Sequence, residues 1–478
     1  MITLLIIIPL LGSLAAWTIP DNRQRPLVLP LTSAMHLMIA TMLIAKPPPP
    51  SLDGWILLDP LGKLVLLGIT ILFFFCAIYS VGYLAYRQER SNRTLCMGLL
   101  LCLSAMSLAT VSQHLGLLWL AIETTTLAMA PLIYFNRNAR SIEATWKYMM
   151  ICSIGIAMAL LGIYFLAYAT VVSNLKPTLL LAPLLAGAKS LSPAWLNGSF
   201  IFLLVGFGTK IGLAPLHTWK PDAYGEAPGL VGALLAGGLV NCGFLGICRI
   251  CQVSAAAGNT NFYQEALIAL GFFSMITAAV FVLKQADFKR VLAYSSVEHV
   301  GFLAIGLGMG KGALYGTLFH LLNNSFIKGV LFLTAANIHR SYKSKRVELV
   351  RGVIERLPWS GWLFMTALFA VTGSPPFSSF ISEFMVISSI FDSGKSLAGI
   401  FIVILFGIIF IGMATTILPI LSGRGDGKDL DNSGYRDKIL TIAPPLLLML
   451  ITLILGIWIP APLQTILSEA AAMLGAQP

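Results

Sequence analysis

Charged residues are scarce in this sequence, and their scarcity excludes most kinds of soluble protein. Only 11% of the 478 residues are charged, whereas 57% are hydrophobic, and the mean hydropathy is +0.85. A soluble chain carries roughly 25% charged residues, which coat the surfaces of its domains. The composition therefore excludes a soluble enzyme, a disordered chain and a nucleic-acid-binding protein. It predicts an all-α polytopic membrane protein without a soluble domain.

Metal-binding and cofactor-binding motifs are also missing. The seven cysteines lie mostly within apolar runs, and the C-x-x-C pair of Cys248 and Cys251 has no second Cys or His pair nearby. Small buried side chains explain them better than a metal or redox site does. We find no flavin, haem or iron–sulfur motif, so we expect no metal and no cofactor in this chain. The N-terminus is apolar from Ile2 and lacks the features of a cleaved secretory signal, which makes it the expected first span.

Long apolar runs are abundant, and they predict about fourteen transmembrane helices. A helix crosses the hydrocarbon core in about 20 residues. The final stretch, 461–478, is too short and polar to cross and is expected to form a short surface helix. The expected spans are residues 2–20, 26–46, 62–86, 94–112, 115–135, 145–171, 199–219, 229–250, 263–283, 291–309, 312–337, 359–391, 397–422 and 439–460.

The basic residues support this count and orient the chain. Of the 31 Lys and Arg residues, 22 fall in loops after odd-numbered spans, seven in even-numbered loops or span ends, and two inside spans. Lys220 is the one basic residue of the loop after span 7. Because cytoplasmic loops are enriched in Lys and Arg, we expect the odd loops in the cytoplasm. Both termini of this multi-pass inner-membrane protein are then on the non-cytoplasmic side.

Four charged residues stand out inside expected spans, where an ionisable side chain is costly and marks a functional site by default. They are Glu123 in span 5, Lys210 in span 7, Lys328 in span 11 and Glu383 in span 12. Two acids and two bases can neutralise one another, which lowers the cost of burial. Structural salt bridges that pin helices together are one interpretation. A relay for protons or cations is the interpretation we favour.

Histidine and asparagine extend this set. His320 precedes Lys328 by about two helical turns, with Asn323 and Asn324 between them, and His299 lies in span 10. Histidine titrates near neutral pH, which suits a proton relay.

Proline interrupts two of the expected spans. Pro215 follows Lys210 in span 7, and Pro375 and Pro376 precede Glu383 in span 12. Discontinuous helices in corresponding positions of two halves mark transport sites. Two ordinary proline kinks are the alternative. Because the breaks lie five spans apart, they predict two inverted five-helix repeats, with the chain divided into residues 1–93, 94–252, 263–422 and 423–478.

Three motifs together resemble one known family. They are GTKIGLAPLHTWKPDAYGEAP (208–228), QADFKRVLAYSSVEHVGF (285–302) and HLLNNSFIKGVLFL (320–333). They are similar to the proton-translocating, antiporter-like membrane subunits of respiratory complex I, multisubunit sodium/proton antiporters and group 4 membrane-bound hydrogenases. The resemblance runs over residues 60–420. Within it, SIEATWKYMMICSIGIA (141–157) and GSPPFSSFISEF (373–384) resemble component F of hydrogenase-4, from formate-hydrogenlyase-like complexes.

The resemblance implies fourteen helices, inverted repeats and a proton path along a buried polar axis. It assigns Glu123 and Lys210 to a coupled pair whose separation tunes the proton affinity of the lysine. It also places His320, Lys328 and Glu383 on the path.

One position departs from the resemblance. Many members carry a lysine in helix 8 where this chain has Asn241, and an asparagine cannot titrate. Either His320, Lys328 and water bridge the centre of the path, or the path is interrupted there.

These observations favour a proton-translocating membrane subunit of a redox-driven complex, either a group 4 membrane-bound hydrogenase or a complex I-like oxidoreductase. The expected partners are other membrane subunits and a soluble hydrogenase or dehydrogenase arm with iron–sulfur subunits. The alternatives are a sodium/proton antiporter subunit and a membrane arm that does not pump. Asn241 keeps the last alternative open.

Overall fold

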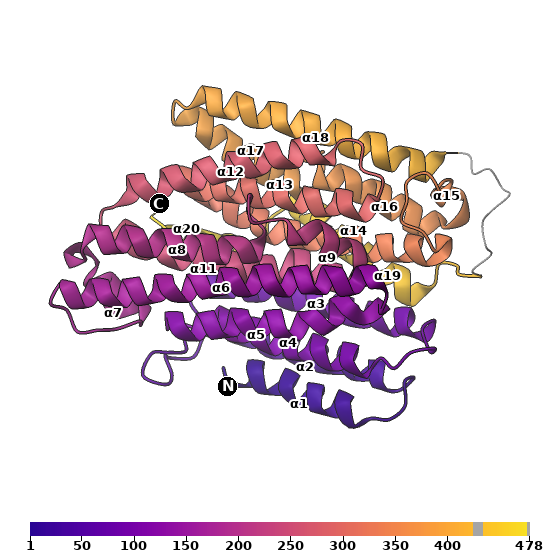
Figure 1. The fold of residues 1–478 in the computed structure, drawn as a ribbon, viewed down its shortest axis with the longest axis horizontal. Helices are drawn as coiled ribbons and strands as arrows, with labels where there is room; N and C mark the ends of the chain where they lie inside the picture. The colour runs from indigo at the N-terminus through magenta and orange to yellow at the C-terminus, as the bar shows by residue number, and fades with distance from the viewer. Residues whose placement is uncertain (424–433, 476–478) are drawn as a thin grey trace.

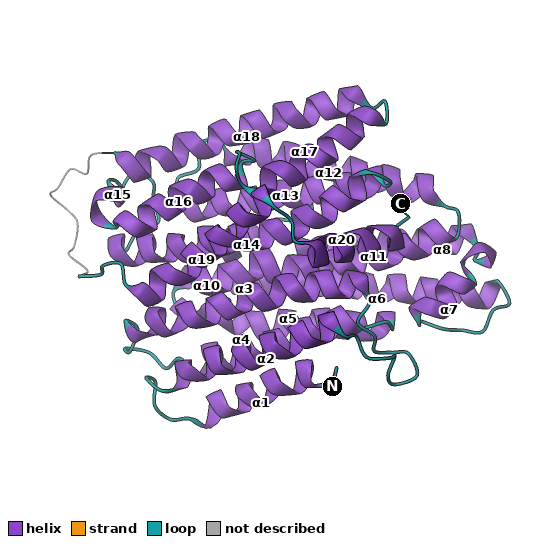
Figure 2. Ribbon diagram, turned by 180° about the vertical axis from the view of Figure 1, so that it is seen from behind, coloured by secondary structure: helices purple, strands orange, loops and turns teal. Residues whose placement is uncertain are grey.

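The computed structural model describes residues 1–423 and 434–475, and these residues form helices and loops without any β-strand (Figures 1 and 2). Short 3-10 turns cover Arg25–Leu27, Tyr134–Asn136 and Ala188–Ser190, and a π-helical turn covers Leu235–Leu239. The α-helices are α1 (Leu4–Thr18), α2 (Val28–Ala45), α3 (Pro60–Ala85), α4 (Arg93–Val111), α5 (Leu115–Ile133), α6 (Ala139–Val172), α7 (Leu181–Ala186), α8 (Pro193–Ile211), α9 (Trp219–Glu226), α10 (Gly229–Leu234), α11 (Val240–Ala256), α12 (Thr260–Val282), α13 (Phe288–Met309), α14 (Ala313–Tyr342), α15 (Val353–Arg356), α16 (Pro358–Val371), α17 (Ser378–Asp392), α18 (Ser396–Ser422), α19 (Ile439–Ile457) and α20 (Ala461–Met473).

Twelve helical segments in this part of the chain are long and apolar enough to cross a membrane. Each coincides with one of the expected spans, and α10, the π-helical turn and α11 form a single span over Gly229–Ala256. The first expected span corresponds to the shorter apolar helix α1, and the twelfth to the interrupted pair α16 and α17. The prediction of an all-helical, multi-pass membrane protein is confirmed.

The helices lie side by side in one broad bundle (Figure 1). The N-terminal helices α1 and α2 lie at one end and α18 lies at the other, while α3 and α14 occupy the middle. The helix α14 and the α10–α11 span are buried along their length, whereas α18 exposes most of its surface. This arrangement follows from composition, because the polar residues of α14 need protein partners and the apolar α18 can face lipid.

Small residues bring neighbouring helices into close contact. At Gly206 of α8, a Cβ atom would collide with the backbone of Ala159 in α6, and Gly271 of α12 meets Gly301 of α13 in the same way. Without a hydrophobic driving force in lipid, such close backbone approach supplies much of the packing between helices. Gly206 therefore fixes α8, and with it Lys210, against α6.

A buried ion pair joins α3 to α11. The Arg249 guanidinium donates to both carboxylate oxygens of Asp59, over 2.5 and 2.8 Å, and Asp59 also caps α3 by accepting from the Gly62 amide. Burial alone would raise the pKa of Asp59, but Arg249 and the Gly62 amide together hold it below its usual value.

The C-terminal stretch forms the expected short helix, but not a free surface one. Leu467 and Ala470 of α20 are buried, and α20 packs against α3 and α14. Within the expected C-terminal unit, 423–478, residues 424–433 and 476–478 lie outside the described residues.

Candidate functional site

Glu123 and Lys210 meet through a hydroxyl group rather than as a direct ion pair. The ammonium of Lys210 in α8 donates to Thr126 Oγ1 over 2.7 Å and to the Tyr148 hydroxyl over 3.1 Å. Thr126 in turn donates to Glu123 Oε2 over 3.0 Å. Lys210 is buried and Glu123 is only half-buried on α5. The carboxylate thus lies toward the outside of the bundle, with the buried lysine one hydroxyl away.

The expected break in span 7 is present and brings a second lysine into the bundle. The helix α8 ends at Ile211, Gly212 adopts the left-handed conformation (φ 73°), and the chain runs past Pro215 before α9 begins at Trp219. A side chain at Gly212 would collide with the aliphatic part of Lys220. Glycine is therefore required here both for its backbone conformation and for the space that Lys220 occupies.

Lys220 is buried completely, although its sequence position indicated a cytoplasmic loop. Its ammonium donates to Ser296 Oγ of α13 over 3.0 Å and lies 5.7 Å from the centre of the Tyr224 ring. Span 7 extends beyond its expected end, because after the break α9 continues toward the end of the bundle where α13 begins, and its residues Trp219 and Tyr224 are buried.

Lys328 reaches the same turn of α13 from α14. Its ammonium donates to Ser295 Oγ over 2.7 Å, next to the serine that accepts from Lys220. Glu298 lies one helical turn further along α13, is buried, and has a carboxylate oxygen, Oε2, without a hydrogen-bond partner. Ser295 and Ser296 thus bring two buried lysines to one helix, with a buried carboxylate nearby.

Sequence analysis missed Glu298 as well as Lys220. Glu298 stands inside expected span 10, so the rule that selected Glu123 and Glu383 applies to it equally. Lys220 gave a weaker signal, because it lies one residue beyond the expected end of span 7.

Two histidines and a serine form an ordered hydrogen-bonded row. His299 Nδ1 and His320 Nε2 lie 2.9 Å apart, and His320 Nδ1 lies 3.0 Å from Ser382 Oγ. The Ser382 hydroxyl also contacts the Ser379 carbonyl, and the donor in each of these bonds depends on which ring nitrogen of each histidine carries the hydrogen.

Glu383 lies beside this row at the second break. The helix α16 ends at Val371, and α17 begins at Ser378 after a segment that contains Pro375 and Pro376. The Glu383 carboxylate rests against Gly373 and is 7% exposed, and its Oε1 atom has no hydrogen-bond partner. Both breaks therefore lie at a buried charged residue, as the sequence predicted.

The cluster of His299, His320 and Glu383 has the composition of a metal site. Their ligand atoms lie within 4.8 Å of one another, and two imidazoles with a carboxylate suit a transition-metal ion. Histidine and carboxylate side chains also have the chemistry of a proton relay, which needs no ion.

Asn241 belongs to a separate, neutral hydrogen-bond network. Its amide donates to Ser325 Oγ over 2.8 Å, and Ser325 donates to the Gly237 carbonyl, inside the π-helical turn, over 2.9 Å. A π-helical turn inside a helix frequently marks a functional site. The structure therefore explains Asn241 as part of the contact between α11 and α14.

The structure thus brings the predicted residues into two groups. Glu123 and Lys210 form the first group, whereas Lys328, His299, His320 and Glu383 gather around α13 and α14 in the second. Within the described residues, none of the four predicted span charges forms a direct ion pair. The hydroxyl of Thr126 joins Glu123 to Lys210 instead, and the hydroxyl of Ser295 accepts from Lys328.

Comparison with known proteins assigns the family. The profile of the NADH:quinone oxidoreductase/Mrp antiporter transmembrane family matches residues 112–410. The chain belongs to this family. The hydrogenase-4 component F homolog of Methylacidiphilum infernorum is 31% identical over 406 residues, which cover 82% of this chain and 84% of the relative. NADH-quinone oxidoreductase subunit N of Desulforudis audaxviator is 29% identical, covering 84% of this chain and 82% of the relative.

Solved structures of membrane complexes share the fold. A chain of the archaeal membrane-bound sulfane sulfur reductase matches with a TM-score of 0.88 and 20% identity, covering 99% of this chain and 98% of that one. A chain of the Mrp complex from Dietzia matches with a TM-score of 0.84 and 19% identity, covering 98% and 96%. A chain of respiratory complex I from Thermus thermophilus matches with a TM-score of 0.82 and 21% identity, covering 100% of both chains.

Proposed function

We propose that this protein is the proton-translocating membrane subunit of a redox-driven complex of the hydrogenase-4 type. The main support for this proposal is the spatial series of charged and hydroxyl groups from Glu123 to Glu383, which lies inside a bundle of membrane-spanning helices. Ionisable groups at membrane depth mark proton and ion pathways. Similarity to a hydrogenase-4 component and to an NADH-quinone oxidoreductase subunit supports the redox partner.

The first step takes place at Glu123 and Lys210. The negative charge of Glu123, relayed through Thr126, stabilises the buried ammonium of Lys210. A conformational or charge change that weakens this interaction leaves the ammonium without compensation, which is costly in a low-dielectric interior. Lys210 then releases its proton inward. Because Glu123 is only half-buried, a neighbouring subunit has direct access to this control point.

Lys220 provides the titratable group at the centre of the path. Lys210 contacts Tyr148, whose ring packs edge-on against Trp219, the residue before Lys220. From Lys220 the serine pair on α13 leads to Lys328. The resemblance assigns the central role to a helix-8 lysine, and in this chain Lys220 replaces it from the break in span 7. A neutral Asn241 therefore does not interrupt the path.

The last part of the path runs from Lys328 to Glu383. Glu298 offers a carboxylate oxygen without a hydrogen-bond partner near Lys328, and His299 is the next residue along the same helix. The row from His299 through His320 to Ser382 then ends beside Glu383. Pro375 and Pro376, in the segment before Glu383, are exposed at membrane depth, so a neighbouring subunit can contact this end of the path.

The partners follow from the chemistry that this chain lacks. The titratable side chains named above carry protons and not electrons, so another subunit has to supply the redox reaction. The similar solved chains come from multisubunit membrane complexes, which supports other membrane subunits as neighbours. We propose a soluble arm with iron–sulfur subunits, a location in the inner membrane, and the division into inverted five-helix repeats over 94–252 and 263–422.

Substitutions at the first pair test the proposal. We expect Glu123→Gln and Lys210→Ala to abolish proton translocation while the complex still assembles, because both remove the control step but leave the helix packing intact. Proton uptake is measured with a pH-sensitive dye in membrane vesicles, driven by the redox substrate of the complex. Lys284→Ala, an exposed loop position, is the control for loss of one lysine.

The alternatives give different results in the same assay. Dye responses that depend on sodium and not on the redox substrate would identify a sodium/proton antiporter subunit. Redox turnover without proton uptake in the unaltered complex would identify a membrane arm that does not pump.

A further inference from the structure

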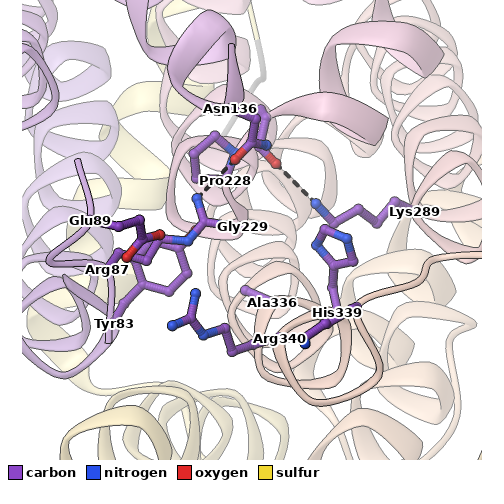
Figure 3. A pocket seen from close by; sticks show the side chains of 12 residues that line it. Tyr83, Arg87, Glu89, Asn136, Pro228, Gly229, Lys289, Ala336, His339 and Arg340 are labelled. Carbon is purple, nitrogen blue, oxygen red and sulfur yellow. Dashed lines mark hydrogen bonds between the residues drawn. The ribbon is translucent and has the colours of Figure 1, made fainter. Parts of the chain in front are cut away.

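A basic pocket lies at the end of the bundle where the loops after spans 3, 5, 7, 9 and 11 converge. We define it by Tyr83, Arg87, Asn136, Lys289, His339 and Arg340, which surround a cavity of about 370 Å³ (Figure 3). Four lining side chains are Lys or Arg, and one, Glu89, is a carboxylate. Positive charge therefore predominates in this cavity.

Neutral groups hold the cations of the basic pocket in place. Arg87 donates to Asn136 Oδ1 over 2.8 Å, Lys289 donates to the Ala227 carbonyl over 2.9 Å, and Arg340 donates to the Tyr86 carbonyl. Figure 3 shows Arg87 and Lys289 making these bonds at the edge of the cavity. Arg87 and Arg340 also lie over the rings of Tyr83 and Tyr86. These contacts fix the side chains without cancelling their charge.

Three cations of the basic pocket have no carboxylate partner among the described residues, unlike cations in its surroundings. In residues 1–423 and 434–475, none of Arg87, Lys289 and Arg340 pairs with a carboxylate, whereas nearby Lys345 and Arg290 both do. Arg87 Nε is buried and has no hydrogen-bond partner. Like charges held together repel, and an anion would relieve that repulsion. The same positive charge makes the cavity a poor place to collect protons.

We propose that the basic pocket binds a phosphate group. Two guanidinium groups and an ammonium that approach from different helices suit a tetrahedral anion with several acceptor oxygens. The position favours a lipid headgroup, because basic pockets between membrane helices bind such groups on the cytoplasmic side. The pocket also lies close to the outer surface of the bundle, because Gly82, next to the pocket residue Tyr83, packs on the exposed Leu440 of α19. A phosphate carried by a soluble metabolite offers the same chemistry.

The bound phosphate would connect separate parts of the bundle. Arg87 follows α3, Asn136 follows α5, Lys289 begins α13, and His339 and Arg340 end α14. The ligand would therefore fix the end of α14, the helix that carries His320 and Lys328, relative to the N-terminal helices.

The test measures phosphate binding by the intact complex in neutral detergent. Thermal unfolding is followed during titration with pyrophosphate, with short-chain phosphatidylglycerol and with short-chain phosphatidylcholine, and native mass spectrometry records retained phospholipid. We expect the anion that stabilises the unaltered complex, pyrophosphate or phosphatidylglycerol, to bind at least tenfold more weakly to Arg340→Gln. Lys284→Gln, which removes one exposed charge outside the pocket, should bind normally. Lys289→Gln repeats the test if Arg340→Gln fails to assemble.

The titrations also identify the source of the phosphate. Stabilisation by phosphatidylglycerol alone indicates an anionic lipid headgroup, whereas stabilisation by pyrophosphate indicates a soluble phosphorylated ligand. The proposal is overturned if neither anion binds, or if the pocket variants bind as tightly as the unaltered complex. Neither result bears on proton translocation, which the vesicle assay measures separately.

Discussion

Lys220 lies one residue beyond the expected end of span 7, and yet its side chain is buried with its ammonium on Ser296. A buried lysine held by one serine hydroxyl, beside an aromatic ring, is inexpensive to deprotonate compared with one that has a carboxylate partner. That property distinguishes Lys220 from Lys345, which pairs with Glu226 at the edge of the bundle. Lys220 is thus suited to alternate between its charged and neutral forms.

We expect Lys220→Met to reduce proton translocation at least tenfold while the complex assembles. Methionine keeps the length and the apolar contacts beside Gly212, but it cannot carry a proton. Redox-driven dye quenching in vesicles measures the effect, with Lys284→Met as the matched control. Normal translocation by Lys220→Met would show that the centre of the path runs without this residue.

At the residue scale, the sequence indicates which charges lie within the membrane-spanning part better than it indicates how they meet. Glu123, Lys210, Lys328 and Glu383 stood out because a charge in an apolar run has few explanations. Their contacts through Thr126 and Ser295 could not be predicted, because hydroxyl residues are common in membrane helices and carry no signal of their own. Which serine faces which lysine depends on helix rotation, and composition does not fix that rotation.

Among the elements, the contact between α6 and α8 positions the first lysine. Gly206 lies one turn before Lys210, and its missing side chain allows α8 to rest on the backbone of Ala159. The same contact sets the distance from Lys210 to Tyr148 on α6. A change in helix separation is therefore transmitted directly to the lysine.

We expect Gly206→Val to destabilise the protein by about 1–3 kcal/mol, the usual cost of overpacking. The lower thermal unfolding temperature in detergent should be accompanied by weaker proton translocation, because Lys210 moves away from Tyr148. Gly407→Val provides the control, since no other atom lies within 4 Å of a Cβ atom built at Gly407 in α18. Equal unfolding temperatures for the two variants would contradict the packing argument.

Hydropathy and proline positions predicted the elements closely, including both broken spans. The continuation of span 7 through α9 was missed, because the segment 219–226 is polar and short, which is typical of a loop. The π-helical turn was also missed. It depends on the Ser325 hydroxyl reaching the Gly237 carbonyl, a contact between residues 88 positions apart.

For the whole molecule, the distribution of Lys and Arg predicts that both termini lie on the non-cytoplasmic side. We expect a cysteine introduced at Asn174, in an even-numbered loop, to react with an impermeant maleimide in intact spheroplasts. A cysteine at Lys284, in an odd-numbered loop, should react only in inverted vesicles. Both positions are exposed, and the native cysteines are buried. The opposite labelling pattern would reverse the orientation.

The complete burial of α14 also has a consequence for biogenesis. Its hydropathy of 1.2 is the lowest among the twelve candidate spans, compared with 2.9 for α18. A helix that carries His320, Asn323, Asn324 and Lys328 partitions poorly into lipid by itself. It therefore has to leave the translocon together with neighbours such as α13, whose Ser295 accepts from Lys328. The proton path and the order of membrane insertion are in this sense set by the same polar residues.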